Sequence, residues 1–202
     1  MTDRPERLRL ACVGGSVTFG LGLENRREEC YPAVLQKLLG DRVNVRNFGY
    51  SGAAVGRQSN EPYWDTPSFT AVNRFEPEVV VIALGTNDAQ HANSHGLETF
   101  AEDFLAFVNH FRRLPHVAAV PVVLPPPVFS PHRHFDIESL DKIVRPTIQQ
   151  VAESVSATVI DGYTPFRDAA RLFPDNLHPN AAAAAQLASL VADALQETGV
   201  LD

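Results

Sequence analysis

The chain has 202 residues, of which 45% are hydrophobic and 20% charged, a composition typical of a globular protein rather than a disordered or fibrous one. This length suits one compact unit, so we expect residues 1–202 to form a single domain. Acidic residues outnumber basic ones by 24 to 17, giving a net charge of −7. That balance argues against nucleic acid and against anionic membrane as main partners, because both bind basic surfaces.

Nothing in the sequence resembles a targeting or membrane segment. Met1–Leu10 is charged and has no apolar centre, so we do not expect a signal peptide. The longest apolar run without proline, Val79–Leu84, is far too short to span a bilayer. We therefore expect a cytoplasmic protein that does not insert into membranes. In that compartment Cys12 and Cys30 are expected to stay unpaired.

Five short apolar segments have the character of buried strands. They are Leu8–Val13, Val43–Asn47, Glu78–Leu84, Val117–Leu124 and Ala157–Asp161. The third contains Val79-Val80-Val81-Ile82, which is apolar on both faces of a strand, as a central parallel strand requires.

Between most of these strands lie segments whose apolar residues have the spacing of a helix. This spacing predicts helices over Tyr31–Leu39, Leu97–Leu114, Ile137–Val155 and Ala181–Gln196. Pro146 is expected to kink or restart the third helix, and Asn180 is expected to cap the last. Because strands and helices alternate, the pattern predicts an α/β fold: a three-layer α/β/α sandwich around a five-stranded parallel sheet.

In such sheets ligands bind at the carboxyl ends of the strands, so the turns after each strand are the places to look. The first turn, Gly14–Gly20, fits no phosphate loop, because Ser16 interrupts G-x-G-x-x-G and Leu21 stands where a P-loop has Lys. Thr18 likewise breaks the nucleophile elbow G-x-S-x-G. What remains is the Ser16 hydroxyl on a tight turn, and the alternative is that Ser16 caps the next helix.

The last turn holds a carboxylate three residues before an imidazole, in Asp175-Asn176-Leu177-His178-Pro179. At this spacing the carboxylate of Asp175 can accept a hydrogen bond from one ring nitrogen of His178. That contact fixes the tautomer and leaves the other nitrogen free to act as a base. The alternative is an Asp–His pair on the surface beside the final helix.

Two further turns carry potential hydrogen-bond donors. In Gly85-Thr86-Asn87-Asp88, the side-chain amide of Asn87 is suited to stabilise a developing oxyanion. In the turn from Asn47 to Gly52, glycine backbone N–H groups offer the same chemistry. The alternatives are an asparagine that merely forms a turn and a glycine that merely adopts a positive φ.

These four turns together resemble the motif blocks of the SGNH (GDSL-like) hydrolase family. The similarity extends over Leu8–Leu195, and the matching blocks are Gly15–Gly20, Asn47–Gly52, Gly85–Asp88 and Asp175–Pro179. The resemblance implies the flavodoxin-like SGNH hydrolase fold. One position departs from the family pattern, because Gly15 stands where the family usually has Asp before its nucleophile.

The resemblance also implies a serine esterase that works through an acyl-enzyme and needs no cofactor or metal. It assigns Ser16 as nucleophile, His178 as general base and acid, and Asp175 as the residue that orients His178. The implied oxyanion hole consists of the backbone N–H groups of Ser16 and Gly52 and the side-chain amide of Asn87. Acyl transfer to another alcohol stays open, as does a non-catalytic carbohydrate- or lipid-binding module, which only Gly15 favours.

Looser similarity concerns the substrate. Leu124–Pro126, Ile143–Ala152 and Ile160-Asp161 resemble the branch of the family that contains carbohydrate and sialate O-acetylesterases. We therefore expect a small-molecule ester as partner, with a short acyl group, above all acetyl, on a carbohydrate-like alcohol. The alternative is a lysophospholipase or arylesterase of the same family. The oligomeric state is not assigned.

Two other groups of residues have two interpretations each. Tyr63 and Trp64 follow the Gly52 turn and could form a substrate wall or fasten a long loop to the core. His132, His134 and Asp136 include a His-x-His pair of the kind found in metal ligand sets. Their proline-flanked loop is more typical of a solvated or substrate-facing rim, so we expect no metal.

Overall fold

The computed structural model describes residues 7–201, so most of Met1–Leu10, where no signal peptide is expected, lies outside the described residues. Its strands are β1 (Leu8–Gly14), β2 (Val43–Gly49), β3 (Val79–Ala83), β4 (Val122–Val123) and β5 (Val159–Ile160). They form one sheet in the order β2-β1-β3-β4-β5, and every neighbouring pair is parallel. This is the flavodoxin-like order, so the predicted five-stranded parallel α/β fold is confirmed.

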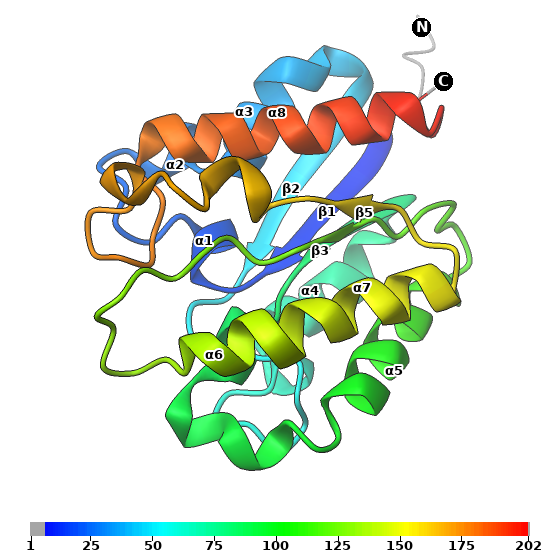
Figure 1. Ribbon diagram of the computed structural model, residues 1–202. Coiled ribbons are helices and arrows are strands. Elements are labelled where there is room, and N and C mark those ends of the chain that lie inside the picture. The colour runs from blue at the N-terminus through cyan, green and yellow to red at the C-terminus, as the bar shows by residue number, and fades with distance from the viewer. Residues whose placement is uncertain (1–6, 202) are drawn as a thin grey trace, which may run out of the picture.

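Helices cover both faces of this sheet. They are α1 (Ser16–Phe19), α2 (Arg26–Glu29), α3 (Tyr31–Leu39), α4 (Pro67–Phe75), α5 (Phe100–Arg112), α6 (Ile137–Ser139), α7 (Arg145–Ser154) and α8 (Ala181–Glu197). Figure 1 shows α3 and α8 together above the sheet, whereas α4, α5 and α7 lie below it.

The alternation of side chains along the central strands builds a core on each face. In β1, Leu10 and Cys12 belong to the core shared with α3 and α8, whereas Ala11 and Val13 belong to the core shared with α4, α5 and α7. All four side chains are completely buried. A strand that is apolar on both faces can occupy only the middle of such a sandwich, which places the turn after β1 at the centre of the sheet edge.

Strands β4 and β5 are shorter than the segments predicted for them. The segment before β4 still follows β3, because the N–H groups of Val80 and Ile82 donate to the carbonyls of Ala119 and Pro121. Pro121 has no N–H group to donate to the neighbouring strand, and three consecutive prolines begin at Pro125. A regular ladder of hydrogen bonds therefore extends only over Val122–Val123.

The long helix predicted over residues 137–155 is divided. A π-helical turn, Leu140–Val144, joins α6 to α7, and Pro146 occupies the first turn of α7. In the first turn a proline costs no hydrogen bond, so the chain restarts its helix there as expected. Asn180 also caps α8 as predicted, because its side chain accepts a hydrogen bond from the Ala183 N–H (3.0 Å).

Helix α4 was not predicted, although its start carries a recognisable signal. The Thr66 hydroxyl oxygen accepts from the Phe69 N–H (3.2 Å), and Pro67 is the first helical residue. This signal stands among aromatic residues that are also compatible with a long loop, so no helix was predicted here.

Within residues 7–201, no helix is long and apolar enough to cross a bilayer. Cys12 and Cys30 are both buried free thiols, as expected.

Candidate active site

Ser16 is the first residue of α1, and Gly15 alone separates it from β1, so its position is set by a very tight strand-to-helix turn. The turn is closed by hydrogen bonds from the Phe19 N–H to the Gly15 carbonyl and from the Gly20 N–H to the Ser16 carbonyl, both 2.9 Å. The turn rests on the end of β2, where a Cβ added to Gly49 would lie 2.2 Å from the Phe19 backbone nitrogen. Only glycine at position 49 lets α1 approach the sheet this closely.

The Asp175–His178 turn folds a carboxylate and an imidazole against each other. The Oδ1 atom of Asp175 accepts from the backbone N–H groups of Leu177 (3.0 Å) and His178 (2.7 Å), while Oδ2 lies 2.6 Å from Nδ1 of His178. Asn176 adopts a left-handed conformation (φ 66°), which asparagine tolerates better than most residues. One oxygen of the Asp175 carboxylate therefore fixes the backbone of the turn, and the other fixes the imidazole ring.

The environment of Asp175 favours its charged form. Partial burial raises the pKa of this carboxyl, but hydrogen bonds from the backbone and ring of His178 and from the Leu177 N–H outweigh it, so the pKa lies below its ordinary value. A charged Asp175 accepts the Nδ1–H of His178, which leaves Nε2 as the free, accepting nitrogen of a neutral ring.

Ser16 and His178 meet at the sheet edge, although 162 positions separate them in the chain. The Ser16 hydroxyl donates to Nε2 of His178 over 2.8 Å. The His178 side chain is 11% exposed, so this contact is largely sheltered from water. The structure thus joins Ser16, His178 and Asp175 into a continuous hydrogen-bonded chain.

Asn87 lies beside the Ser16 turn, as predicted for an oxyanion donor. It belongs to a short 3-10 turn after β3 and is 6% exposed. Its Nδ2 donates to the Ala53 carbonyl (2.9 Å), and a Cβ added to Gly15 would lie 3.1 Å from the same nitrogen. Glycine in place of the family's usual Asp at position 15 therefore leaves room for the amide of Asn87.

Gly52 belongs to the same cluster. The next residue, Ala53, places its carbonyl oxygen 3.5 Å from a Cβ added to Gly15, so the Gly52 turn adjoins the Ser16 turn. Gly52 has a positive φ (88°), and within residues 7–201 no group accepts a hydrogen bond from its N–H. The structure brings together all the predicted catalytic and oxyanion-hole residues.

Asp88 anchors the loop that follows Gly52. It is 4% exposed, and its Oδ1 accepts from the N–H groups of Val55 (3.0 Å) and Gly56 (2.7 Å). Burial raises the pKa of Asp88 to about 7, although these hydrogen bonds lower it. No role was predicted for Asp88, although its place in the Gly85–Asp88 block was a signal for one.

Tyr63 does not line the site, so the interpretation of this residue as part of a substrate wall is wrong. Its side chain is completely buried, and its hydroxyl donates to the Phe48 carbonyl (2.6 Å). A side chain with no exposed surface cannot stack on a sugar. Tyr63 fastens the loop to the core, which is the other interpretation given to it above.

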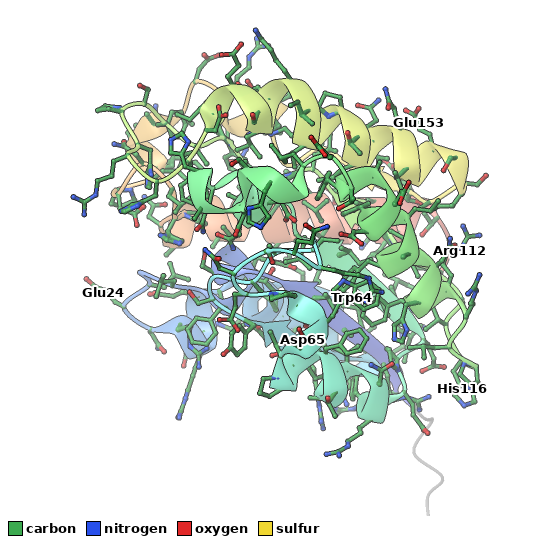
Figure 2. The ribbon with its side chains drawn as sticks, turned by 90° about the horizontal axis from the view of Figure 1, so that it is seen from below. Glu24, Trp64, Asp65, Arg112, His116 and Glu153 are labelled. Carbon is green, nitrogen blue, oxygen red and sulfur yellow. The ribbon has the colours of Figure 1, made fainter. Side chains whose placement is uncertain are left out.

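Trp64 also serves to hold this loop. Its indole N–H donates to the Val55 carbonyl (2.9 Å), its ring meets Phe107 edge-on, and the Arg57 guanidinium lies 3.8 Å from its centroid. In Figure 2 Trp64 lies over the α4–α5 side of the molecule, away from Glu24, which lines a cleft of about 480 Å³ together with Asp175 and His178. A role for Trp64 in substrate binding stays a prediction.

The loop with His132 and His134 borders the site. The Phe129 N–H donates to the Asn176 carbonyl (2.8 Å), which ties this loop to the Asp175–His178 turn. Burial and the neighbouring His134 lower the pKa of His132. Among the described residues, no three His, Cys, Asp or Glu side chains gather closely enough to hold a metal ion.

Comparison with known proteins shows which family the chain resembles. A family model described as GDSL-like Lipase/Acylhydrolase matches residues 12–186. An acetylxylan esterase from Xylanibacter ruminicola is 29% identical over 211 residues, covering 96% of this chain and 44% of the relative. The chain thus spans less than half the length of that relative.

Solved structures share the fold. A carbohydrate acetylesterase family member from Sinorhizobium meliloti matches with a TM-score of 0.72 at 19% identity, covering 94% of this chain and 98% of the other. An aryl esterase from M. smegmatis matches with a TM-score of 0.73 at 19% identity, covering 94% and 99%. Together with the family model, which spans most of the sequence, these findings confirm the resemblance seen in the four motif blocks: the chain belongs to the GDSL-like lipase/acylhydrolase family.

Proposed function

We propose that the protein is a serine esterase that removes short acyl groups, above all acetyl, from a carbohydrate-like alcohol. The observation that carries this proposal is the 2.8 Å contact between the Ser16 hydroxyl and Nε2 of His178, with Asp175 on the other ring nitrogen. A hydroxyl, an imidazole and a carboxylate in this order form the arrangement that activates serine for attack on an ester.

In the first half-reaction, Ser16 Oγ attacks the ester carbonyl carbon as its proton passes to Nε2 of His178. The tetrahedral intermediate carries a negative oxygen, which accepts hydrogen bonds from the backbone N–H groups of Ser16 and Gly52 and from Nδ2 of Asn87. The carbon–oxygen bond to the alcohol then breaks, and His178 returns the proton to the departing alcohol oxygen. An acyl-serine ester remains.

In the second half-reaction, water replaces the alcohol. His178 takes a proton from the water as its oxygen attacks the acyl carbon, and the same three donors hold the second oxyanion. When the bond to Ser16 Oγ breaks, His178 gives the proton back to the serine. The carboxylic acid leaves and the enzyme returns to its starting state.

The preference for acetyl esters of carbohydrates rests on similarity. The relative from Xylanibacter ruminicola is named an acetylxylan esterase, and three short segments of this chain resemble the carbohydrate-acetylesterase branch. Since the chain matches only part of that relative, its own substrate has to be measured.

Replacing the nucleophile tests the reaction. Ser16→Ala should abolish nearly all hydrolysis of p-nitrophenyl acetate without unfolding the chain, and a serine-directed phosphonate should label the wild type but not this variant. Ser189→Ala is a matched control, because Ser189 lies exposed on α8 and its hydroxyl donates to the Ala185 carbonyl of the same helix. Wild-type activity in Ser16→Ala would overturn the proposal.

A second series tests the substrate. Rates with p-nitrophenyl esters should fall steeply from acetyl to octanoyl, and acetylated xylo-oligosaccharides should release acetate. An octanoyl optimum would instead identify a lipase-like enzyme. Hydrolysis of aryl acetates with no release of acetate from any acetylated sugar would identify an arylesterase.

A further inference from the structure

The orientation of the Asn87 side chain is fixed by two contacts of opposite polarity. Its Nδ2 donates to the Ala53 carbonyl over 2.9 Å, and its Oδ1 accepts from Nε2 of Gln90 over 2.7 Å. If the amide turned over, its oxygen would face a carbonyl oxygen and its NH2 group would face the NH2 group of Gln90. Both contacts would then become repulsive, so the pair allows a single orientation.

Within residues 7–201, Nδ2 of Asn87 donates to the Ala53 carbonyl alone, which leaves its second hydrogen available. The Nδ2 atom adjoins the Ser16 turn, since a Cβ added to Gly15 would lie 3.1 Å from it. Because Asn87 is only 6% exposed, the protein rather than solvent decides which atom faces that turn.

Gln90 is itself held in place by the backbone around it. Its N–H donates to the Asn87 carbonyl (3.2 Å), and it forms an isolated antiparallel bridge with Phe135. On either side, the Asp136 N–H donates to the Ala89 carbonyl (2.9 Å) and the His91 N–H donates to the His134 carbonyl (3.1 Å). The loop that borders His178 therefore also braces the residue that contacts Asn87.

We propose that Gln90 is a positioning residue for the esterase reaction: it holds the Asn87 amide with Nδ2 toward the oxyanion and so sets the third donor of the oxyanion hole. This inference rests on the proposed function and extends it to a residue outside the four motif blocks. Gln90 acts through Asn87 and does not touch the reacting atoms.

Two substitutions at this position separate orientation from simple packing. Gln90→Leu removes the donor and should lower kcat on p-nitrophenyl acetate by about tenfold or more, with KM within about twofold. Gln90→Glu replaces the donor with a charged acceptor, which favours the turned-over amide, so its kcat should fall further, toward that of Asn87→Ala. Gln149→Leu is a matched control, because Gln149 is exposed on α7 and its side chain bonds only Glu153 among residues 7–201.

A double-mutant cycle assigns the effect to Asn87. In the Asn87→Ala background, Gln90→Leu should change kcat by less than about twofold, because the group it positions is gone. Equal kcat losses in both backgrounds would overturn the proposal, as would a wild-type kcat in Gln90→Leu or a Gln90→Glu variant more active than Gln90→Leu.

A spectroscopic measurement separates this inference from the proposed function. The side-chain NH2 signals of Asn87, identified by their loss in Asn87→Ala, should shift in Gln90→Leu but not in Gln149→Leu. Unshifted signals would refute the role of Gln90 even if the protein hydrolyses esters. Shifted signals in a protein whose Ser16→Ala variant stays active would support the role of Gln90 in holding Asn87 and reject the serine mechanism.

Discussion

Asp175 divides its two carboxylate oxygens between two tasks. Oδ1 holds the turn by accepting from the backbone N–H groups of Leu177 and His178, and Oδ2 accepts from the imidazole. An asparagine can keep the first task with its oxygen, but its NH2 group would then face Nδ1 of His178. The ring would carry its proton on Nε2 and could no longer accept the hydroxyl proton of Ser16.

We therefore expect Asp175→Asn to keep the fold and lose turnover. The value of kcat should fall on the order of a thousandfold or more, as expected when the wrong tautomer is stabilised. Steady-state kinetics together with thermal unfolding would check this. Asp168→Asn serves as control, because Asp168 is exposed and, in the described part of the chain, pairs only with Arg167. A kcat within tenfold of wild type would contradict the assigned role of Asp175.

Asn87→Ala should affect both catalysis and stability. Loss of one oxyanion donor should lower kcat by about a hundredfold or more with little change in KM. The Ala53 carbonyl and the Gln90 amide also lose a buried partner, which should lower the free energy of unfolding by about 1–3 kcal/mol. Kinetics and urea unfolding measure the two effects separately. A variant that loses stability but keeps its kcat would show that Asn87 is only structural.

At the residue scale, the sequence indicates which residues form the site but not which contacts orient each side chain. Ser16, Asn87 and His178 could be found because family motifs mark them. Gln90 could not, because nothing in its residue type or spacing shows that its side chain reaches back to Asn87. Tyr63 was misplaced for a related reason: an aromatic residue after an oxyanion turn is compatible with either a substrate wall or a core contact, and only burial decides between them.

At the scale of elements, α1 depends on how closely β2 lets it approach. A methyl group at position 49 would meet the Phe19 backbone at 2.2 Å, and backbone cannot rotate away as a side chain can. Gly49→Ala should therefore push α1 and Ser16 outward. We expect the free energy of unfolding to fall by about 1–3 kcal/mol or more and kcat to fall with it.

Thermal unfolding and p-nitrophenyl acetate hydrolysis would check the effect of Gly49→Ala. Gly96→Ala provides the comparison, since no atom lies within 4 Å of a Cβ added there and its φ needs no glycine. If both substitutions had the same effect, close packing of α1 on β2 would not be what positions Ser16.

The success of the predicted elements depended on which signal marked each one. Helix α3 was predicted with its observed ends, because its apolar spacing stops at Gly40. Strand β4 was predicted too long because apolar character does not reveal the hydrogen bonds that Pro121 cannot make. Helix α4 was not predicted, because its start is marked by Thr66 and Pro67 in a segment whose aromatic residues are also compatible with a loop.

At the scale of the whole molecule, Asp88 should link stability to pH. Its pKa is raised to about 7 in the folded state by burial, above the ordinary value of 3.8. The folded protein thus binds this proton more tightly than the unfolded chain does. The corresponding stabilisation is complete below about pH 4 and is lost as the pH rises through 7.

Urea unfolding at pH 5 and pH 8 would measure this link. The wild type should lose stability over this interval, and Asp88→Asn should lose less, because an amide oxygen can still accept from Val55 and Gly56 without a charge. The exposed Asp193 gives a control in Asp193→Asn, which should keep the wild-type slope. Equal slopes in all three proteins would contradict the raised pKa of Asp88.

The single domain and the cytoplasmic location stay predictions.

The contact between Ser16 and His178 has a consequence for biosynthesis. Ser16 is synthesised 162 positions before His178, so the site cannot assemble until the chain has been made through His178. A nascent chain stalled before position 178 should carry no esterase activity. Co-expressed amino-terminal and carboxyl-terminal fragments that recover turnover would report their own reassociation, which makes this fold a candidate for a split-enzyme reporter.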